Sequence, residues 1–210
     1  MIRVHVRRKS FGATDVLKDV NFALQDGECL AILGKSGVGK STLLRLVADI
    51  DQDFTGQIER PEKMAFVFQE PTLLPWRSAI DNLLIVHPDL DQRGAKVMLA
   101  RVGLADKADH FPGQLSLGQQ RRLALARAFA GRPELLILDE PFVSLDEKTA
   151  KEMLALTRGL LKEISPTTLF VTHEREEAEL LADRTMELVG SPATVAPNVV
   201  RPNFIREEAQ

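Results

Sequence analysis

The sequence predicts an α/β fold built around a mainly parallel sheet, and three observations support that prediction. Apolar runs rich in β-branched residues recur along the chain, each followed by a turn and a stretch of helical periodicity. The runs alternate little between apolar and polar residues, as expected of strands that are buried on both faces. One run leads directly into a glycine-rich turn and an amphipathic helix. The runs are residues 29–33, 64–68, 135–138 and 169–172.

The composition points to one folded domain, or to a domain with a smaller lobe. The chain has 210 residues, 44% of them hydrophobic, and its 27 Lys and Arg against 30 Asp and Glu give a net charge of −3. A chain of this length buries roughly 70% of its unfolded surface, so it needs no disulfide or metal to fold. The near balance of charge argues against nucleic-acid binding as the main activity. The lone cysteine, Cys29, fits a reducing compartment.

No apolar run approaches the roughly 20 residues that a helix needs to cross a bilayer. Residues 1–10 carry Arg7, Arg8 and Lys9, and they are too polar for a signal peptide. If the protein acts at a membrane, we expect another chain to cross it.

The remaining elements follow in order. Residues 2–6 and 20–24 alternate between apolar and polar, which predicts a more exposed antiparallel edge. A first helix is expected to begin near Gly39, and a second at Asp146, whose side chain suits an N-cap. The first apolar stripe comprises Leu43, Leu46, Val47 and Ile50, and the second comprises Ala150, Met153, Leu154, Leu160, Leu161 and Ile164.

Prolines divide the rest of the chain. Between residues 70 and 116 they break the pattern into short helical pieces, so we expect an inserted helical subdomain at about 70–130. They recur in residues 191–210, which predicts a poorly ordered C-terminal tail. The sequence thus predicts one domain over residues 1–190, followed by that tail. The prolines are Pro71, Pro75, Pro88 and Pro112, and in the tail Pro192, Pro197 and Pro202.

Residues 34–41 match the pattern G-x-x-x-x-G-K-[ST] between a predicted strand and a predicted helix. Glycines let successive backbone N–H groups converge on phosphate oxygens, and the helix N-terminus adds partial positive charge. Lys40 supplies an ammonium group for the β- and γ-phosphates, and the Ser41 hydroxyl suits Mg²⁺. A plain glycine-rich turn is the alternative, but the flanking elements favour a nucleoside triphosphate site. The predicted cradle comprises Gly34, Lys35, Ser36, Gly37, Val38, Gly39, Lys40, Ser41 and Thr42.

Two apolar runs end in side chains suited to hydrolysis. Asp139 and Glu140 follow one run, and the carboxyl ends of parallel strands gather where ligands bind. We expect Asp139 to lie near the metal and Glu140 to orient or deprotonate the attacking water. His173 ends another run, where an imidazole can hydrogen-bond the γ-phosphate. The alternatives are an acidic strand exit that caps the next element, and a structural histidine.

A further motif identifies the type of nucleotide-binding protein. The segment Leu115-Ser116-Leu117-Gly118-Gln119-Gln120 resembles the L-S-G-G-Q signature of the ATP-binding cassette (ABC) ATPases. Gln69 matches the family's Q-loop glutamine, residues 144–146 its D-loop and His173 its switch histidine. Phe11 lies where the family places an aromatic residue that stacks on adenine. The motifs occur in the family's order, and the resemblance runs from about residue 2 to residue 190.

The resemblance implies a P-loop ATPase of the ABC type that works as a pair. Two cassettes, this chain with a second copy of itself or with a paralogue, would dimerise head to tail around two ATP molecules. Ser116 can cap the following helix, and its N-terminus forms a second anion site. In that arrangement Ser116, Gly118 and Gln119 complete the partner's site, while Asp146 communicates across the interface. Leu117 replaces the usual glycine near the rim of this site, where we expect it to be tolerated; slower closure of the dimer is the alternative.

The resemblance also implies the roles of the residues around the metal. Mg²⁺ would be held by Ser41, with Gln69 and Asp139 nearby. Glu140 and His173 would align the water that attacks the γ-phosphate, and Gln69 would reach the metal and that phosphate. ATP and Mg²⁺ are therefore the expected ligands.

Two features remain open at this stage. Asp49 and Asp51 place carboxylates at the end of the first helix, where each costs roughly 0.3–1 kcal/mol if exposed, because the helix dipole is negative there. No function is indicated for them. The arginines that follow the signature suit either a contact or a solvated helix face. They are Arg121, Arg122 and Arg127.

Residues 67–78 indicate the kind of cassette. The segment is similar to the corresponding part of the nitrate/sulfonate/taurine importer ATPases, where Gln-x-x-x-Leu-Leu-Pro-Trp precedes a helix that contains an asparagine, here Asn82. Leu73, Leu74 and Trp76 would offer an apolar surface to a coupling helix of the permease. Packing inside the subdomain is the alternative for these side chains.

The resemblance therefore implies the ATP-binding and hydrolysing subunit of an importer. Its partners would be integral-membrane permease subunits, a second cassette and, indirectly, a solute-binding protein. We expect a peripheral location on the cytoplasmic face of the plasma (inner) membrane, and no nucleic acid as partner. The alternatives are an export or cell-division cassette, a soluble cassette that acts without a membrane partner, and a nucleotide-binding subunit without turnover.

Overall fold

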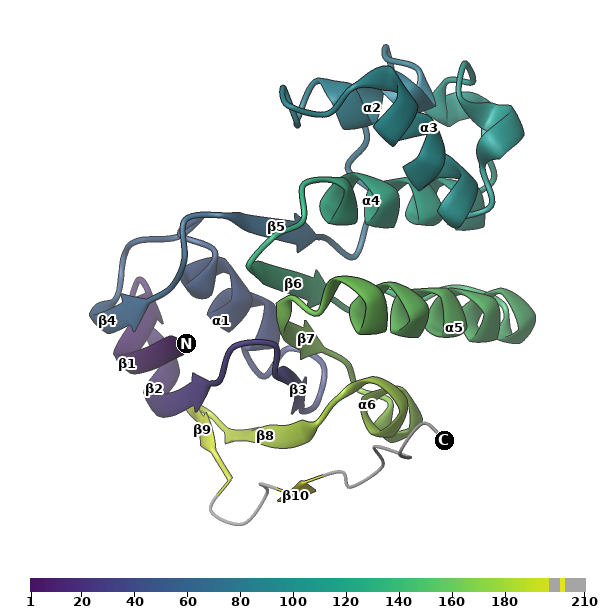
Figure 1. Cartoon of the computed structure of the whole chain (residues 1–210). Coiled ribbons are helices and arrows are strands. Elements are labelled where there is room, and N and C mark those ends of the chain that lie inside the picture. The colour runs from purple at the N-terminus through teal and green to yellow at the C-terminus, as the bar shows by residue number, and fades with distance from the viewer. Residues whose placement is uncertain (197–200, 203–210) are drawn as a thin grey trace. The chain divides into compact units, whose positions relative to one another are not determined.

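The computed structural model describes residues 1–196 and 201–202, and the chain divides into two compact units (Figure 1). The first unit comprises Met1–Glu62 and the described chain from Thr167 onward, and the second comprises Lys63–Pro166. The greater part of the tail expected at 191–210 lies outside the described residues. Within the described ranges, no helix is both long and apolar enough to cross a membrane.

The first unit is a mixed sheet with two helices. Its strands follow the order β4-β1-β2-β9-β8-β3-β7, and β10 pairs with β8. The central strand β3 is parallel to both of its neighbours, β7 and β8, whereas β1 is antiparallel to β2 and β4. The elements are β1 (Ile2–Phe11), β2 (Thr14–Leu24), β3 (Cys29–Leu33), α1 (Lys40–Val47), β4 (Thr55–Glu59), β7 (Thr167–Val171), α6 (Arg175–Leu181), β8 (Arg184–Gly190), β9 (Ala193–Val195) and β10 (Arg201–Pro202).

The core of this unit follows from its apolar strands. Every residue of β3 and β7 is buried, as expected for strands that are covered on both faces. The strand β1 begins with strict alternation, so Ile2, Val4 and Val6 are buried on one face. The prediction of an antiparallel N-terminal edge is confirmed, with β4 outermost, and β1 and β2 are both longer than the alternating segments indicated.

The second unit joins a parallel strand pair to a group of helices. The strands β5 and β6 are parallel to each other, and α2 and α3 both contact α4, which also contacts β5 and α5 (Figure 1, teal to green). The elements are β5 (Met64–Val67), α2 (Ala79–Leu84), α3 (Gln92–Arg101), two 3₁₀ turns (Ala105–Lys107 and Pro112–Gln114), α4 (Leu117–Ala130), β6 (Leu135–Asp139) and α5 (Glu147–Ile164).

The helix α4 occupies the centre of this unit. Leu123, Leu125 and Phe129 are fully buried or nearly so, and the alanines between them are buried as well. A helix that is buried nearly all round needs neighbours on several sides, which α2, α3 and α5 provide.

The predicted helices agree with the observed ones better at their first residues than at their last. Gly39 and Asp146 precede α1 and α5 as expected. The prediction that Ile50 belongs to the first apolar stripe was wrong, because α1 ends at Val47 and Asp49 takes a left-handed φ of 61°. Ile50 is consequently exposed. The strand β9 extends the ordered sheet into the segment that was expected to be a tail.

Candidate active site

The glycine-rich loop between β3 and α1 has a backbone that only glycines allow. Gly34 has a φ of 155°, and a Cβ atom placed there would lie 2.8 Å from the carbonyl oxygen of Leu188. Gly39 has a φ of 111°, and its Cβ would lie 3.0 Å from a methyl carbon of Leu17. Both positions are left-handed and closely packed, so any side chain would move the loop. The two glycines therefore let the loop pack closely against β8 and β2.

The N-terminus of α1 is open to a ligand. Gly39 offers no side chain to cap it, and its first turn contains no acidic residue. By contrast, α2, α4 and α5 begin with Ser78, Ser116 and Asp146, whose side chains each accept a hydrogen bond from a backbone N–H of the first turn. The positive end of the helix dipole favours an anion at such a terminus.

Lys40 places a positive charge within this loop. Its side chain is buried, and Nζ donates hydrogen bonds to the carbonyl oxygens of Gly34 (2.9 Å) and Lys35 (3.1 Å). The ammonium group is thus held across the loop that the sequence predicts to be a phosphate cradle. The other predicted cradle residues lie in the same loop and in the first turn of α1.

His173 lies beside the start of the same loop. The strands β3 and β7 are paired in register at Ile32 and Val171, so the residues that follow each strand emerge together. A cavity of about 270 Å³ is lined there by Gly34, Lys35 and His173, with contributions from the neighbouring strand β8 and helix α6. The structure therefore brings the predicted switch histidine and the phosphate loop into one pocket, although they lie far apart in the sequence.

Phe11 lies at the end of β1, immediately before a turn at Gly12. Its ring is 55% exposed, which is unusual for a large apolar side chain at the end of an ordered strand. Phe11 does not belong to the residues that line the cavity of His173.

In the second unit, β6 ends in the two predicted carboxylates. Asp139 is buried and is the last residue of the strand. Glu140 follows with a φ of 44°, and its carbonyl oxygen accepts a hydrogen bond from the N–H of Val143 at 3.3 Å. A left-handed backbone is uncommon for a glutamate, and such conformations concentrate at functional sites.

The signature and the D-loop form one pocket in this unit. A cavity of about 490 Å³ is lined by residues of both segments. The helices α4 and α5 begin side by side, because a Cβ at Gly118 would lie only 3.0 Å from the Thr149 methyl group. The predicted residues in this lining are Ser116, Gly118, Gln119 and Asp146, together with Leu117.

Both helices that open on this cavity are capped by predicted site residues. The Ser116 hydroxyl accepts from the Gln119 N–H at 3.3 Å, and the Gln119 side chain accepts from the Ser116 N–H at 3.0 Å. Asp146 accepts from the Thr149 N–H (3.0 Å) and hydroxyl (2.6 Å). These hydrogen bonds from Thr149 lower the pKa of Asp146, so the carboxylate is charged at neutral pH. The expectation that Ser116 caps its helix is confirmed.

Gln69 is exposed and begins the loop that leads to α2. Arg127 of α4 holds the next residues of this loop: its guanidinium donates to the carbonyl oxygens of Pro71 (3.4 Å) and Thr72 (3.1 Å) and to the Thr72 hydroxyl (3.3 Å). The loop that follows the predicted Q-loop glutamine is therefore attached to the helix that follows the signature.

Asn82 fixes the other end of the same loop. It is fully buried at the start of α2. Its side-chain oxygen accepts from the Leu74 N–H at 2.8 Å, and its amide nitrogen donates to the carbonyl oxygens of Leu74 (3.2 Å), Arg77 (3.2 Å) and Ser78 (2.9 Å). Between these anchors, Trp76 is 68% exposed. We name residues 71–78 the docking loop.

The arginines after the signature do not form a solvated helix face. Arg121 is buried and donates to the carbonyl oxygen of Pro141 (3.3 Å), directly after Glu140. Among the described residues, its Nε is the buried side-chain nitrogen or oxygen atom without a hydrogen-bond partner. Arg122 forms an ion pair with Glu152 at 2.7 Å. Each arginine thus joins α4 to a different segment.

The sequence predicted no structural role for Asn82 and left the role of Arg127 open, whereas both side chains hold the docking loop. A signal existed for Arg127, since it interrupts an apolar helix face. Among the residues that the structure describes, no group of three or more His, Cys, Asp or Glu side chains is placed to hold a metal ion.

A parallel sheet that leads into a glycine loop, an uncapped helix and a buried lysine defines a P-loop nucleotide-binding protein. The model of the family described as "ABC transporter" matches residues 17–143. The chain belongs to the ABC transporter family. Like that family's other nucleotide-binding cassettes, it is an ATPase.

Known relatives and solved structures agree with this assignment. The chain is 43% identical over 195 residues to the aliphatic sulfonates import ATP-binding protein SsuB of Zymomonas mobilis subsp. mobilis, covering 89% of this chain and 81% of the relative. It is 44% identical to SsuB of Mycobacterium sp. (strain MCS), covering 90% and 79%. The dimeric post-hydrolysis structure of the ATP-binding cassette MJ0796 bound to ADP and Pi superposes with a TM-score of 0.80 at 28% identity, covering 97% of this chain and 99% of that one.

Proposed function

We propose that the chain is the ATP-hydrolysing subunit of an ABC importer, whose solute belongs to the class of small organic sulfonates. One observation carries the proposal: the chain holds a glycine-rich phosphate loop before α1 and, separately, a cavity at the start of α4 that the signature and the D-loop line together. A head-to-tail pair of cassettes needs both, because each nucleotide meets the phosphate loop of one copy and the signature of the other. The relatives named for sulfonate import favour import over export, cell division or a non-transport role.

The first unit supplies the nucleotide's binding groups. The backbone N–H groups of the loop and of the first turn of α1 bind the phosphates, and Lys40 neutralises their charge. His173, which shares a cavity with Gly34 and Lys35, donates a hydrogen bond to the γ-phosphate. Phe11 presents its exposed ring to the adenine.

The second unit supplies the groups for hydrolysis and closure. Glu140 orients the attacking water and accepts its proton at a carboxylate oxygen. Ser116, Gly118 and Gln119 face the γ-phosphate of the partner copy's nucleotide, because they line the cavity at the positive end of the α4 dipole. Asp146 lines the same cavity and transmits closure between copies.

The expected magnesium ligands fit that ion. Ser41, Gln69 and Asp139 offer a hydroxyl, an amide and a carboxylate oxygen, which are the hard donors that Mg²⁺ takes, and this ion keeps water and phosphate oxygens as its remaining ligands. Mg²⁺, when bound, neutralises charge that develops on the transferred phosphoryl group. So few protein donors are typical of a magnesium ion that binds together with its nucleotide.

The docking loop supplies the coupling to transport. Its exposed Trp76, with Leu73 and Leu74 half-buried beside it, offers an apolar surface to a permease helix. Arg127 and Asn82 hold this surface to the helices of the second unit, so the loop moves with them. The partners are accordingly permease chains at the cytoplasmic face of the inner membrane, which receive solute from a binding protein.

The test compares Glu140→Gln and Lys40→Ala with Glu134→Gln, a matched change at an exposed glutamate before β6. With Mg²⁺, Glu140→Gln should bind ATP normally, hydrolyse it at least ~10²-fold more slowly because the base is gone, and accumulate as a dimer. Lys40→Ala should lose ATP binding. Both variants should abolish sulfonate import by the complex, while Glu134→Gln should leave it unchanged. Normal turnover in Glu140→Gln, or normal ATP affinity in Lys40→Ala, would contradict the assignment.

A further inference from the structure

Lys9 is a nearly fully buried cation near the end of β1, which pairs with β2 on one side and β4 on the other. Its side chain is 2% exposed, although strict alternation from Val4 and Val6 would place residue 8 on the buried face. An irregularity in the pairing of β1 with β4, between Val6 and Arg8, shifts the alternation so that Lys9 turns inward. Burying a charge is costly unless it is paired and hydrogen-bonded, so this lysine requires specific partners.

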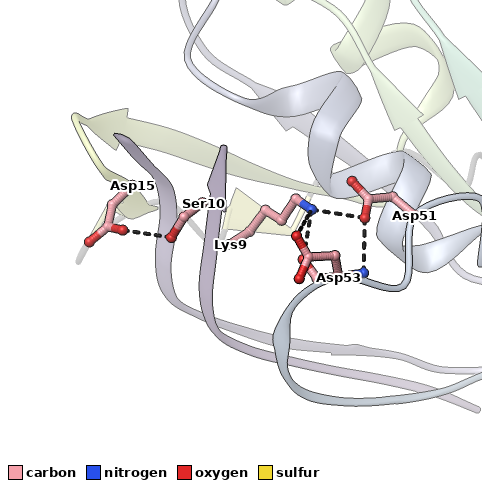
Figure 2. A network of polar contacts seen from close by, with 5 residues as sticks. All are labelled: Lys9, Ser10, Asp15, Asp51 and Asp53. Carbon is pink, nitrogen blue, oxygen red and sulfur yellow. Dashed lines mark hydrogen bonds and ion pairs between the residues drawn. The ribbon is translucent and has the colours of Figure 1, made fainter. Parts of the chain in front are cut away.

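The hydrogen-bond acceptors of Lys9 belong to Asp51 and Asp53, in the segment after α1 (Figure 2). Its ammonium group donates to a carboxylate oxygen of Asp51 at 2.8 Å, to the carbonyl oxygen of Asp53 at 2.6 Å and to the Asp53 carboxylate at 3.4 Å. Asp51 also accepts from the Asp53 N–H at 3.0 Å. Burial lowers the pKa of Lys9, but the hydrogen bond and charge of Asp51 and the charge of Asp53 outweigh it and raise the pKa above its ordinary value.

The same ammonium group lies over the ring of Phe11. Nζ is 4.7 Å from the ring centroid, well within the range of a cation–π interaction. The pairing of β1 with β2 is irregular between Lys9 and Ser10, and the ring of Phe11 nevertheless meets the Lys9 ammonium group. One face of the ring is thus occupied by a charge that three acceptors hold in place, while the ring remains 55% exposed.

We infer that Lys9 is a positioning residue for the nucleotide base. The Lys9 ammonium, clamped by Asp51 and Asp53, fixes the Phe11 ring in one orientation and leaves its other face for adenine. The inference rests on the proposed function, in which Phe11 stacks on the base. Preorganisation of a ring before binding removes part of the ordering cost of the complex. The clamp also connects the base platform to the end of α1, the helix that carries the phosphate loop.

The experiment separates base binding from phosphate binding. Lys9→Met keeps the length of the side chain and removes its charge, and Lys18→Met makes the same change at an exposed position on the adjoining strand β2. Calorimetric titration with Mg²⁺ measures the affinity for ATP and for inorganic triphosphate, which has no base. Lys9→Met should weaken ATP binding about 3-fold to 10-fold, because it removes the cation–π interaction and with it part of the stacking on the base. It should leave the affinity for triphosphate within about 2-fold of that of the unaltered chain. Lys18→Met should bind both ligands as the unaltered chain does.

Phe11→Ala and the double variant complete the test. Phe11→Ala should weaken ATP binding and not triphosphate binding, and Lys9→Met added to it should cost nothing more, since the ring on which it acts is gone. If Phe11→Ala weakens ATP binding and Lys9→Met does not, the inference is wrong while the proposed site stands. If Lys9→Met weakens the binding of ATP and of triphosphate equally, or if the effects of the two substitutions on ATP affinity add in the double variant, Lys9 is a structural tether only. Either result would also overturn the inference. If Phe11→Ala changes nothing, both the base platform and the inference are wrong.

Discussion

Two aspartates with no evident use in the sequence have partners in the structure. Asp51 accepts from Lys9, and Asp49 forms an ion pair with Arg60 at 2.8 Å. Neither partner could be read from the sequence, because 42 residues separate Lys9 from Asp51 and the irregularity that turns Lys9 inward leaves no pattern. Two ion pairs therefore offset the destabilisation that carboxylates at the end of α1 were expected to cause.

Asp51 should make stability depend on pH in the acid range. The hydrogen bond from Lys9 lowers the pKa of Asp51. A carboxyl with a lowered folded pKa stabilises the fold above its unfolded pKa of about 3.9, and that contribution is lost as the pH falls through the folded pKa. Asp51→Asn should therefore cost about 1.5–3 kcal/mol of unfolding free energy at pH 7, the value of a hydrogen bond to a charged group. The difference should shrink towards pH 2–3.

Urea unfolding of the full chain at pH 7 and at pH 3 measures this difference. Asp109→Asn, at an exposed position of the second unit, is the control and should have little effect at either pH. A cost of Asp51→Asn that is the same at both pH values would contradict the role of its charge.

At the scale of elements, the sequence predicted those helices and strands that have a regular apolar periodicity or a fixed local motif. The buried strands, the start of α1 and the Asp146 cap followed from apolar periodicity and from local capping chemistry, which involve neighbours in the chain. The attachment of the docking loop could not be predicted in this way, because Arg127 binds Thr72, which lies 55 residues earlier in the chain. Periodicity also gave no sign of β9, a strand of three residues that is ordered only by its pairing.

The docking loop should depend on one buried amide. Asn82→Ala removes four hydrogen bonds and leaves the Leu74 N–H without its acceptor, so it should destabilise the second unit by roughly 2 kcal/mol. Hydrogen exchange should accelerate at residues 72–78 more than in α4. Coupling of ATPase activity to the permease should weaken, while ATP binding should remain.

Asp81→Ala is the matched control, since Asp81 is the neighbouring residue of α2 and contributes only its backbone N–H to the Ser78 cap. It should leave exchange in the docking loop unchanged. Uniform acceleration across the whole unit in Asn82→Ala would instead indicate a general packing role.

At the scale of the molecule, the motif order predicted the family, and the structure adds how each unit presents its motifs. The glycine loop and His173 are joined by strand pairing in one unit, and the signature and D-loop by the close approach of α4 and α5 in the other. The sequence could predict the members of these sites because motif chemistry is local. It could not predict the cavity that Leu117 shares with Ser116, which depends on the packing of two helices.

Leu117 should limit how tightly two copies close. It lies at the first position of α4, is 45% exposed and lines the signature cavity, where the partner's phosphates are expected. Leu117→Gly should therefore tighten the ATP-dependent dimer formed in a Glu140→Gln background, about 3-fold or more in dissociation constant. Replacement by glycine at a helix terminus costs less than the ~1 kcal/mol of a helix interior, so the fold should persist.

Sedimentation with Mg-ATP measures the monomer–dimer equilibrium. Val97→Gly, at an exposed apolar position of α3 outside the cavity, should not tighten the dimer. An unchanged or weaker dimer in Leu117→Gly would show that the leucine contributes contacts instead of obstructing them.

The chain contains one tryptophan and no tyrosine, and that tryptophan stands exposed at the tip of the docking loop. Its emission is therefore an intrinsic optical reporter at the surface proposed to meet the permease. A blue shift on adding permease in detergent would record coverage of the indole ring without any label, and the same signal would time each engagement during the ATP cycle.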